Sequence, residues 1–194
     1  MTKIYYLFIL TLFFSVNFNG QQKSSIVVNG RAQKDKILLR WAVDSAPSWQ
    51  KTNKDGFLLN RLTIKKNGKL LTNPKKELIA EIKAAPLATW EVLANKDNYA
   101  AIIAQALYGE TFEVGQESQG SVAKIINASE EINQRYSFSL FAADQSFEGA
   151  IKAGWGYVDT NVREDEVYAY QVEAKNLKDI NSGAVMIGVG DYDI

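Results

Sequence analysis

The chain of 194 residues contains no cysteine and no histidine. Without cysteine it can form no disulfide and carry no lipidated cysteine, so an exported domain must rely on its core alone. Without histidine it lacks the commonest general base, the commonest zinc ligand and the usual pH switch. Together the two absences exclude Ser-His-Asp and Cys-His catalysis.

An excess of charge of either sign is also missing, because 22 lysine and arginine residues balance 22 aspartate and glutamate residues. Proteins that bind nucleic acid usually carry a basic footprint, so we expect no nucleic-acid partner. Glu130 and Glu131 are adjacent on an expected helix and do not converge like the paired carboxylates of a glycosidase. The acidic turn of residues 159–166 matches no EF-hand spacing, and we interpret it as solvated. The sequence therefore predicts no enzyme, no catalytic residue, no cofactor and no metal site.

Residues 1–20 have the pattern of a signal peptide. Lys3 supplies the positive charge, an apolar run follows from Ile4 to Val16, and polar residues come next. The run is shorter than the roughly 20 residues that a membrane span needs. We expect cleavage near Gly20, no membrane span after it, and export to the periplasm, the outer surface or the medium.

Alternation of apolar and polar residues predicts strands in two blocks of the chain. In the last block Tyr168, Tyr170, Val172 and Ala174 would share one face of a strand. The dipeptide at 67–68 is Asn-Gly, a strong signal for a hairpin turn. Residues 44–55 are expected to form a polar loop. The expected strands cover residues 25–32, 36–43, 56–64, 69–71, 167–176 and 184–189, with one more resuming at 155.

Between these blocks the apolar period becomes that of a helix. Asn73 could cap a helix that starts at Pro74, and Leu78, Ile79 and Ile82 recur at helical spacing before Pro86. Other helices are expected near residues 90–93, 99–107, 121–140 and 146–154.

Three strand patterns, taken in order, resemble a fibronectin type III domain. Ile37-x-Leu39-x-Trp41 is similar to its second strand, and Gly56-Phe57-x-Leu59-x-Arg61 to its third. Val167-Tyr168-x-Tyr170-x-Val172 is similar to its sixth strand with a corner tyrosine. The resemblance covers about half of the chain, residues 25–71 and 155–190. It implies an immunoglobulin-like β-sandwich, mainly β, with Trp41, Phe57, Arg61, Tyr168 and Tyr170 as structural residues. The chain is also similar to N-terminal regions of secreted fibronectin-like proteins of Bacteroidetes-type bacteria.

The departure from this family is an insertion. About a hundred residues separate Arg61 from Tyr168, where the family has a few tens. We expect one domain over residues 24–194, interrupted by a helical insertion over about 72–154. The insertion could bind a protein or cover an open sheet edge, and the sequence leaves both open. The chain is expected to be either the first module of a longer protein or a lone module.

Three tryptophans and one serine are candidate site residues. Trp49, Trp90 and Trp155 could form a stacking surface for a sugar, with Trp49 in its polar loop the best candidate for exposure. Trp90 and Trp155 could equally fasten the insertion to the sandwich. Ser45 lies in Asp-Ser-Ala, which looks like the O-glycosylation acceptor of Bacteroidetes, although an unmodified loop is the simpler interpretation.

These observations favour an exported, non-catalytic module for adhesion or for assembling an envelope complex. Its partner would be a protein of the envelope or the cell surface. The alternative is a carbohydrate-binding or accessory module of a secreted polysaccharide-processing system, with a glycan as the ligand.

Overall fold

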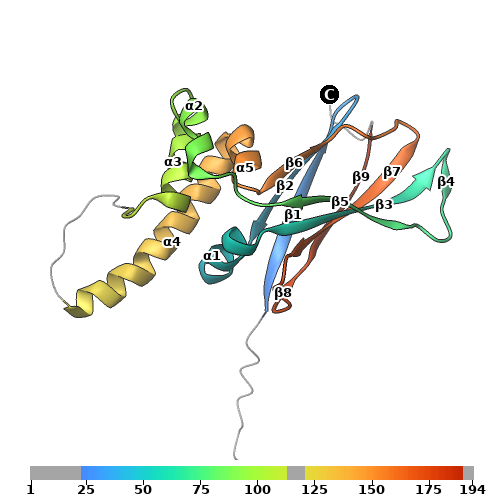
Figure 1. Cartoon of the computed structure of the whole chain (residues 1–194). Coiled ribbons are helices and arrows are strands. Elements are labelled where there is room, and N and C mark those ends of the chain that lie inside the picture. Colours follow the sequence, from blue (N-terminus) through green and yellow to red (C-terminus); the bar gives the residue numbers. More distant parts are fainter. Residues whose placement is uncertain (1–22, 113–120, 190–194) are drawn as a thin grey trace, which may run out of the picture.

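The computed structural model describes residues 23–112 and 121–189, with the side chains of the second range given from residue 129 onward. The expected signal peptide lies outside these residues. The chain has a mixed α and β fold, in which two sheets stand together and a group of helices lies at one side of them (Figure 1). Within the described ranges every helix except the first comes from one stretch of the chain, between the fifth and sixth strands.

The first sheet has four strands in the order β6-β2-β1-β8, of which β1 and β8 are parallel and the others antiparallel. Its strands are β1 (Ser24–Ala32), β2 (Ile37–Val43), β6 (Gly156–Asp159) and β8 (Ile180–Asn181). In the second sheet, which is antiparallel, β3 lies between β7 and β5, β9 lies outside β7, and β4 extends the hairpin of β3. Its strands are β3 (Phe57–Lys66), β4 (Lys69–Leu70), β5 (Lys76–Ile82), β7 (Glu166–Ala174) and β9 (Gly183–Gly188).

The predicted alternation is confirmed in the two strands that form the centre of the core. Every second residue of β2 is buried, from Ile37 to Val43, and the same holds for β7 from Glu166 to Val172. Trp41 of the first sheet meets Phe57 of the second edge to face, with ring centroids 5.9 Å apart. The inner faces of the two sheets therefore share one apolar core.

The sheets approach closely where β9 passes β1. A Cβ added to Gly183 would lie 2.2 Å from the carbonyl oxygen of Ile26, and one added to Gly30 would lie 3.2 Å from the side chain of Ile187. Because a side chain at Gly183 would collide with backbone, this position requires glycine.

The hairpin predicted at Asn67 and Gly68 is confirmed. Both residues have positive φ, 50° and 76°, as a type I′ turn demands. Lys66 pairs with Lys69 across the turn, but the returning strand β4 is only two residues long.

The polar loop predicted over residues 44–55 is wrong, because most of it is helix α1 (Ala46–Asp55). Pro47 lies in the first turn, where its missing N–H costs nothing, and Gly56 with φ 86° ends the helix. The buried face of α1 consists of Ala46, Ser48, Trp49 and Thr52, in which small and polar residues obscure the apolar stripe. The sequence pattern therefore looked like a loop.

The helix predicted after Pro74 is also wrong, because residues 76–82 form strand β5 beside β3. Seven residues are too few to separate the two periods when the apolar ones are sparse. Leu78 is half exposed, Glu77 pairs with Arg61 of β3, and Glu81 pairs with Lys175, the residue after β7. Pairing with an open strand edge has thus prevailed over a weak helical pattern.

The remaining helices occupy residues 87–152, a shorter stretch than the 72–154 expected. We call this stretch the helical segment. Its elements are a 3₁₀ turn (Leu87–Thr89), α2 (Glu91–Ala94), α3 (Asn98–Tyr108), α4 (Ser121–Gln145) and α5 (Phe147–Lys152). Asp97 caps α3 and its other carboxylate oxygen accepts from Ser146, the cap of α5, at 2.5 Å. Two helix starts are thus held by one pair of side chains.

The two ends of the helical segment meet at a neck next to the sheets. The backbone N–H of Ala85 donates to the carbonyl of Lys152 at 2.8 Å. Gly154, with φ 79°, packs against the backbone of Lys83 so closely that a Cβ would lie 2.8 Å from it. Beyond the neck, the Tyr136 hydroxyl of α4 donates to the carbonyl of Val43 at 2.9 Å and ties the helical segment to β2.

Candidate functional site

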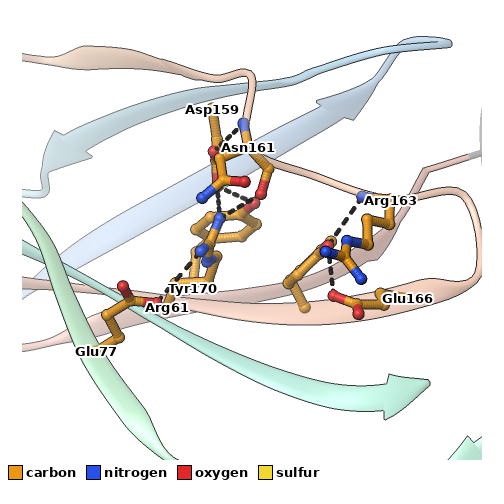
Figure 2. A network of polar contacts seen from close by, with 8 residues as sticks. Arg61, Glu77, Asp159, Asn161, Arg163, Glu166 and Tyr170 are labelled. Atoms are coloured by element: carbon orange, nitrogen blue, oxygen red, sulfur yellow. Dashed lines mark hydrogen bonds and ion pairs between the residues drawn. The ribbon is translucent and has the colours of Figure 1, made fainter.

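A buried polar network joins the two sheets (Figure 2). The Arg61 guanidinium donates to Asp159 Oδ2 at 2.8 Å and to the Asn161 carbonyl at 2.7 Å. The Tyr170 hydroxyl donates to the same Asp159 oxygen at 2.8 Å. Asp159 is only 3% exposed, so it does not belong to a solvated turn as the sequence had suggested. Its charge is compensated by Arg61, which is itself buried.

The tyrosine two residues earlier fixes the turn before β7. The Tyr168 hydroxyl accepts from the backbone N–H of Arg163 at 2.9 Å and donates to Glu166 Oε2 at 2.8 Å. This contact of a hydroxyl with backbone a few residues upstream resembles that of a tyrosine corner. Glu166 in turn pairs with Lys66 at 2.8 Å. The Arg61 guanidinium lies over the Tyr168 ring, 5.3 Å from its centroid.

The pKa values of this network follow from burial and from the ion pair. Burial raises the pKa of Tyr168 to about 12, and the hydrogen bond to Glu166 adds to the rise. The pKa of Tyr170 is also raised, by burial first and then by Asp159. Burial is the largest single influence on Arg61 and lowers its pKa, but the hydrogen bonds to Asp159 and Glu77 and the charge of Asp159 together outweigh it, so the net pKa is raised. The network therefore keeps neutral tyrosines around one ion pair.

These shifts predict how stability depends on alkaline pH. An unfolded tyrosine loses its proton near pH 10, whereas folded Tyr168 keeps it until about pH 12. Above about pH 10 the unfolded state therefore binds fewer protons, and the free energy of unfolding falls as pH rises. The contribution of Tyr168 to the free energy of unfolding is fully present below about pH 10 and is lost as the pH rises to about 12. Urea unfolding measures the free energy of unfolding of the wild type and of Tyr168→Phe as a function of pH. We expect this free energy to fall less steeply with rising pH in the variant, and equal slopes would contradict the prediction.

The arrangement of these groups indicates a structural role. Arg61, Asp159 and Tyr170 are buried and bind one another. Of the five structural residues that the family resemblance implied, Arg61, Tyr168 and Tyr170 lie in this network, whereas Trp41 and Phe57 contact each other. Asp159 completes the set; nothing local in the sequence marks it as the partner of Arg61, which lies 98 residues away.

The three tryptophans proposed as a stacking surface are all buried. Trp49 is 4% exposed, Trp90 1% and Trp155 2%. Trp49 was expected in an open loop, but α1 turns it inward, where it packs against Tyr136 and Trp155. The indole Nε1 of Trp155 donates to Asn53, and that of Trp90 donates to the Ala85 carbonyl. Their positions fit the alternative interpretation, in which Trp90 and Trp155 fasten the helical segment.

Ser45 lies at the N-terminal cap of α1 and is half-buried. Its hydroxyl is 2.7 Å from that of Ser24, which accepts from the Ser48 hydroxyl at 2.8 Å. A glycan at Ser45 would have to disrupt this hydroxyl cluster. The structure therefore gives the proposed acceptor a less accessible place than the expected loop.

Two features that involve the helical segment were not predicted from the sequence. The first is a group of exposed aromatic side chains on α3 and α4, Tyr99, Phe138 and Phe141, which we call the aromatic ridge. They are 39%, 39% and 56% exposed, and the rings of Tyr99 and Phe141 meet edge to face at 6.1 Å. Phe138 is backed by Phe112, 6.0 Å away. The signal was present in the sequence, because Phe138 and Phe141 lie three residues apart and off the apolar stripe of Ile132, Tyr136 and Leu140.

The second feature is a cleft of ≈ 510 Å³ between α1, the C-terminal end of α3 and α4. Arg135 of α4 holds one wall by donating to the carbonyls of Gln105, Ala106 and Gly109 at 2.8–3.1 Å. It also binds Glu131, one helical turn before it, at 2.6 Å. Two carbonyls in the last turn of α3, and that of Gly109 after it, are thereby bound by a side chain, and the cleft is a preformed part of the fold.

Comparisons with protein-family models, with curated proteins and with solved structures gave no significant match to this chain. None of the helices in residues 23–112 and 121–189 is both long and apolar enough to cross a membrane. In the same ranges, no three acidic side chains gather where a metal ion could be held.

Proposed function

We propose that this protein is an exported, non-catalytic interaction module: a fibronectin type III-like sandwich that presents a helical segment to a protein partner. The order of the strands supports the sandwich. The first, second and sixth strands are neighbours in one sheet, while the fifth, third, seventh and ninth are neighbours in the other. The tyrosine contact before β7 and the pair of Trp41 and Phe57 between the sheets are further support.

The observation that carries the function is the aromatic ridge. Large aromatic side chains are costly to leave in water, and monomeric proteins seldom expose them together without a use. Aromatic residues are also enriched where protein partners bind. The ridge lies on the helical segment, which the two sheets do not require for their own pairing. The partner that fits it is a protein surface with an apolar pocket.

The carbohydrate-binding alternative has less support. It depends on a flat aromatic face that is open to solvent, and the three tryptophans that suggested it are at most 4% exposed. Tyr99 and Phe141 meet edge to face rather than side by side, so they form no flat platform.

Cross-linked affinity capture from the native cells tests the proposal. The tagged wild type should capture a specific envelope protein, and Phe141→Ala should weaken that capture by about tenfold or more, as expected for a central interface aromatic. Met186→Ala is the matched control, because Met186 is also apolar and 64% exposed but lies on β9. Equal capture by Phe141→Ala and the wild type would refute the ridge as the docking face.

A further inference from the structure

The cleft next to α1 has the size and position of a ligand site. Its volume of ≈ 510 Å³ falls inside the range of roughly 300–1,000 Å³ that small-molecule sites occupy. It lies where the helical segment meets the sheet-bound helix α1, and such junctions are preferred places for ligands. It is distinct from the aromatic ridge, since none of the three ridge residues lines it.

One side of the cleft offers hydrogen-bond donors from α1. Gln50 and Lys54 are exposed at its rim, and Asn53 lies between them. The Asn53 side-chain oxygen already accepts from Trp155 Nε1 at 2.9 Å, so the NH₂ group is what Asn53 has left to offer. These three residues share one face of α1 because they lie three and four positions apart.

Among the described residues that line the cleft, Lys54 and Arg135 are positive and Glu131 is negative. Glu131 is neutralised by Arg135, which contacts one of its oxygens through both Nε and Nη2, at 2.8 and 2.6 Å. The guanidinium itself is committed to this carboxylate and to the carbonyls of Gln105, Ala106 and Gly109. Lys54 forms no ion pair with any residue in the described part of the chain. Of the lining residues in the described ranges, Lys54 is therefore a cation without an ion pair, and it stands at the rim beside the donors of α1.

The remaining wall is largely apolar. Its side chains are those of Trp49, Ala84, Ala106, Leu107, Tyr108 and Ile132. A ligand that suits both sides must place a negative group near Lys54 and an apolar group against this wall.

We propose that the cleft binds a carboxylate flanked by an apolar group, as at the carboxyl end of a peptide chain. A carboxylate accepts several hydrogen bonds at once, which suits the ammonium of Lys54 and the amides of Gln50 and Asn53. Capture of a terminal carboxylate is a recurrent mode of peptide recognition. A sugar acid would share the charge but would lack an apolar group for the opposite wall.

The test is an NMR titration of the exported protein labelled with ¹⁵N. The probes are acetyl-Ala-Ala with a free carboxylate, the same dipeptide with a terminal amide, and glucuronate. We expect the free acid alone to shift the backbone signals of Gln50, Asn53 and Lys54 and the indole signal of Trp49, which borders the cleft. Equal binding of acid and amide, or no shift with the acid, would overturn the proposal; binding of glucuronate in place of the dipeptide acid would overturn its peptide assignment.

Two lysine variants make the test specific. Lys54→Gln keeps a polar side chain, one atom shorter, but removes the charge, so affinity for the dipeptide acid should fall by about tenfold or more. Lys96→Gln is the matched control: Lys96 is also exposed and without an ion pair in the described residues, but it lies outside the cleft. Equal losses in both variants would mean a general charge effect and would refute the site. Phe141→Ala should leave the titration unchanged, so the proposals for the cleft and for the aromatic ridge can be refuted independently of each other.

Discussion

Replacing Asp159 by alanine is expected to lower the free energy of unfolding by about 3–5 kcal/mol, the usual cost of breaking a buried ion pair. The substitution leaves the Arg61 guanidinium in the core without the carboxylate that lies 2.8 Å away. It also removes the acceptor of the buried Tyr170 hydroxyl. Both losses leave polar groups that water cannot reach. Urea unfolding followed by tryptophan fluorescence measures the change.

The matched control is Glu77→Ala. Glu77 binds the same guanidinium at 3.2 Å, but its side chain is 61% exposed. Removing an exposed partner should cost no more than about 1 kcal/mol. If the two substitutions destabilised the protein equally, burial of the Arg61–Asp159 pair would not be the cause of its importance.

Trp155→Ala is the second substitution with a large expected effect, again about 3–5 kcal/mol. The side chain is 2% exposed and lies at the junction of the sheets and the helical segment. It packs against Trp49 of α1 with ring centroids 6.1 Å apart, and Arg40 of β2 lies 6.0 Å above its ring. Its loss would open a cavity and free the Asn53 oxygen from its donor.

The damage should be uneven across the molecule. Because Trp155 supports α1 and the start of β6, amide hydrogen exchange should rise most in α1 and least in β7 and β9. Phe141→Ala serves as the control, since its ring is 56% exposed and its loss should change stability by no more than about 0.5 kcal/mol. A uniform rise in exchange would show that Trp155 acts on the whole core rather than on the junction.

Local patterns in the sequence were enough for the centre of the sheets. The alternation in β2 and β7 depends on neighbouring residues only, and so does the turn at Asn67 and Gly68. Alternation also identified Trp41 and Tyr168 as core residues. Each of these features is set within ten residues, which is the range over which period and turn chemistry operate.

Features that depend on partners far away in the chain could not be predicted from the sequence. Strand β5 exists because β3 offers it an edge, and Trp49 is buried because Tyr136 of α4 and Trp155 pack against it. The cleft needs α1, α3 and α4 together, and their order in the chain does not reveal their proximity. Tertiary contacts therefore decided the points on which propensity and period were ambiguous.

The neck between Ala85 and Lys152 has a consequence for how the chain reaches this fold. β3 pairs with β7 and β2 pairs with β6, so each pairing must close a loop that contains the whole helical segment. Helices form from local contacts, which generally appear before distant strand pairs. Once α3 and α4 pack, the two ends of the helical segment are held together. The effective length of the loop that the strand pairs must close is then far shorter than the number of residues in it. The entropy lost on closing it falls accordingly. A long insertion that would slow folding if it were unstructured therefore holds together the strands that precede it and those that follow it, and so favours their correct register.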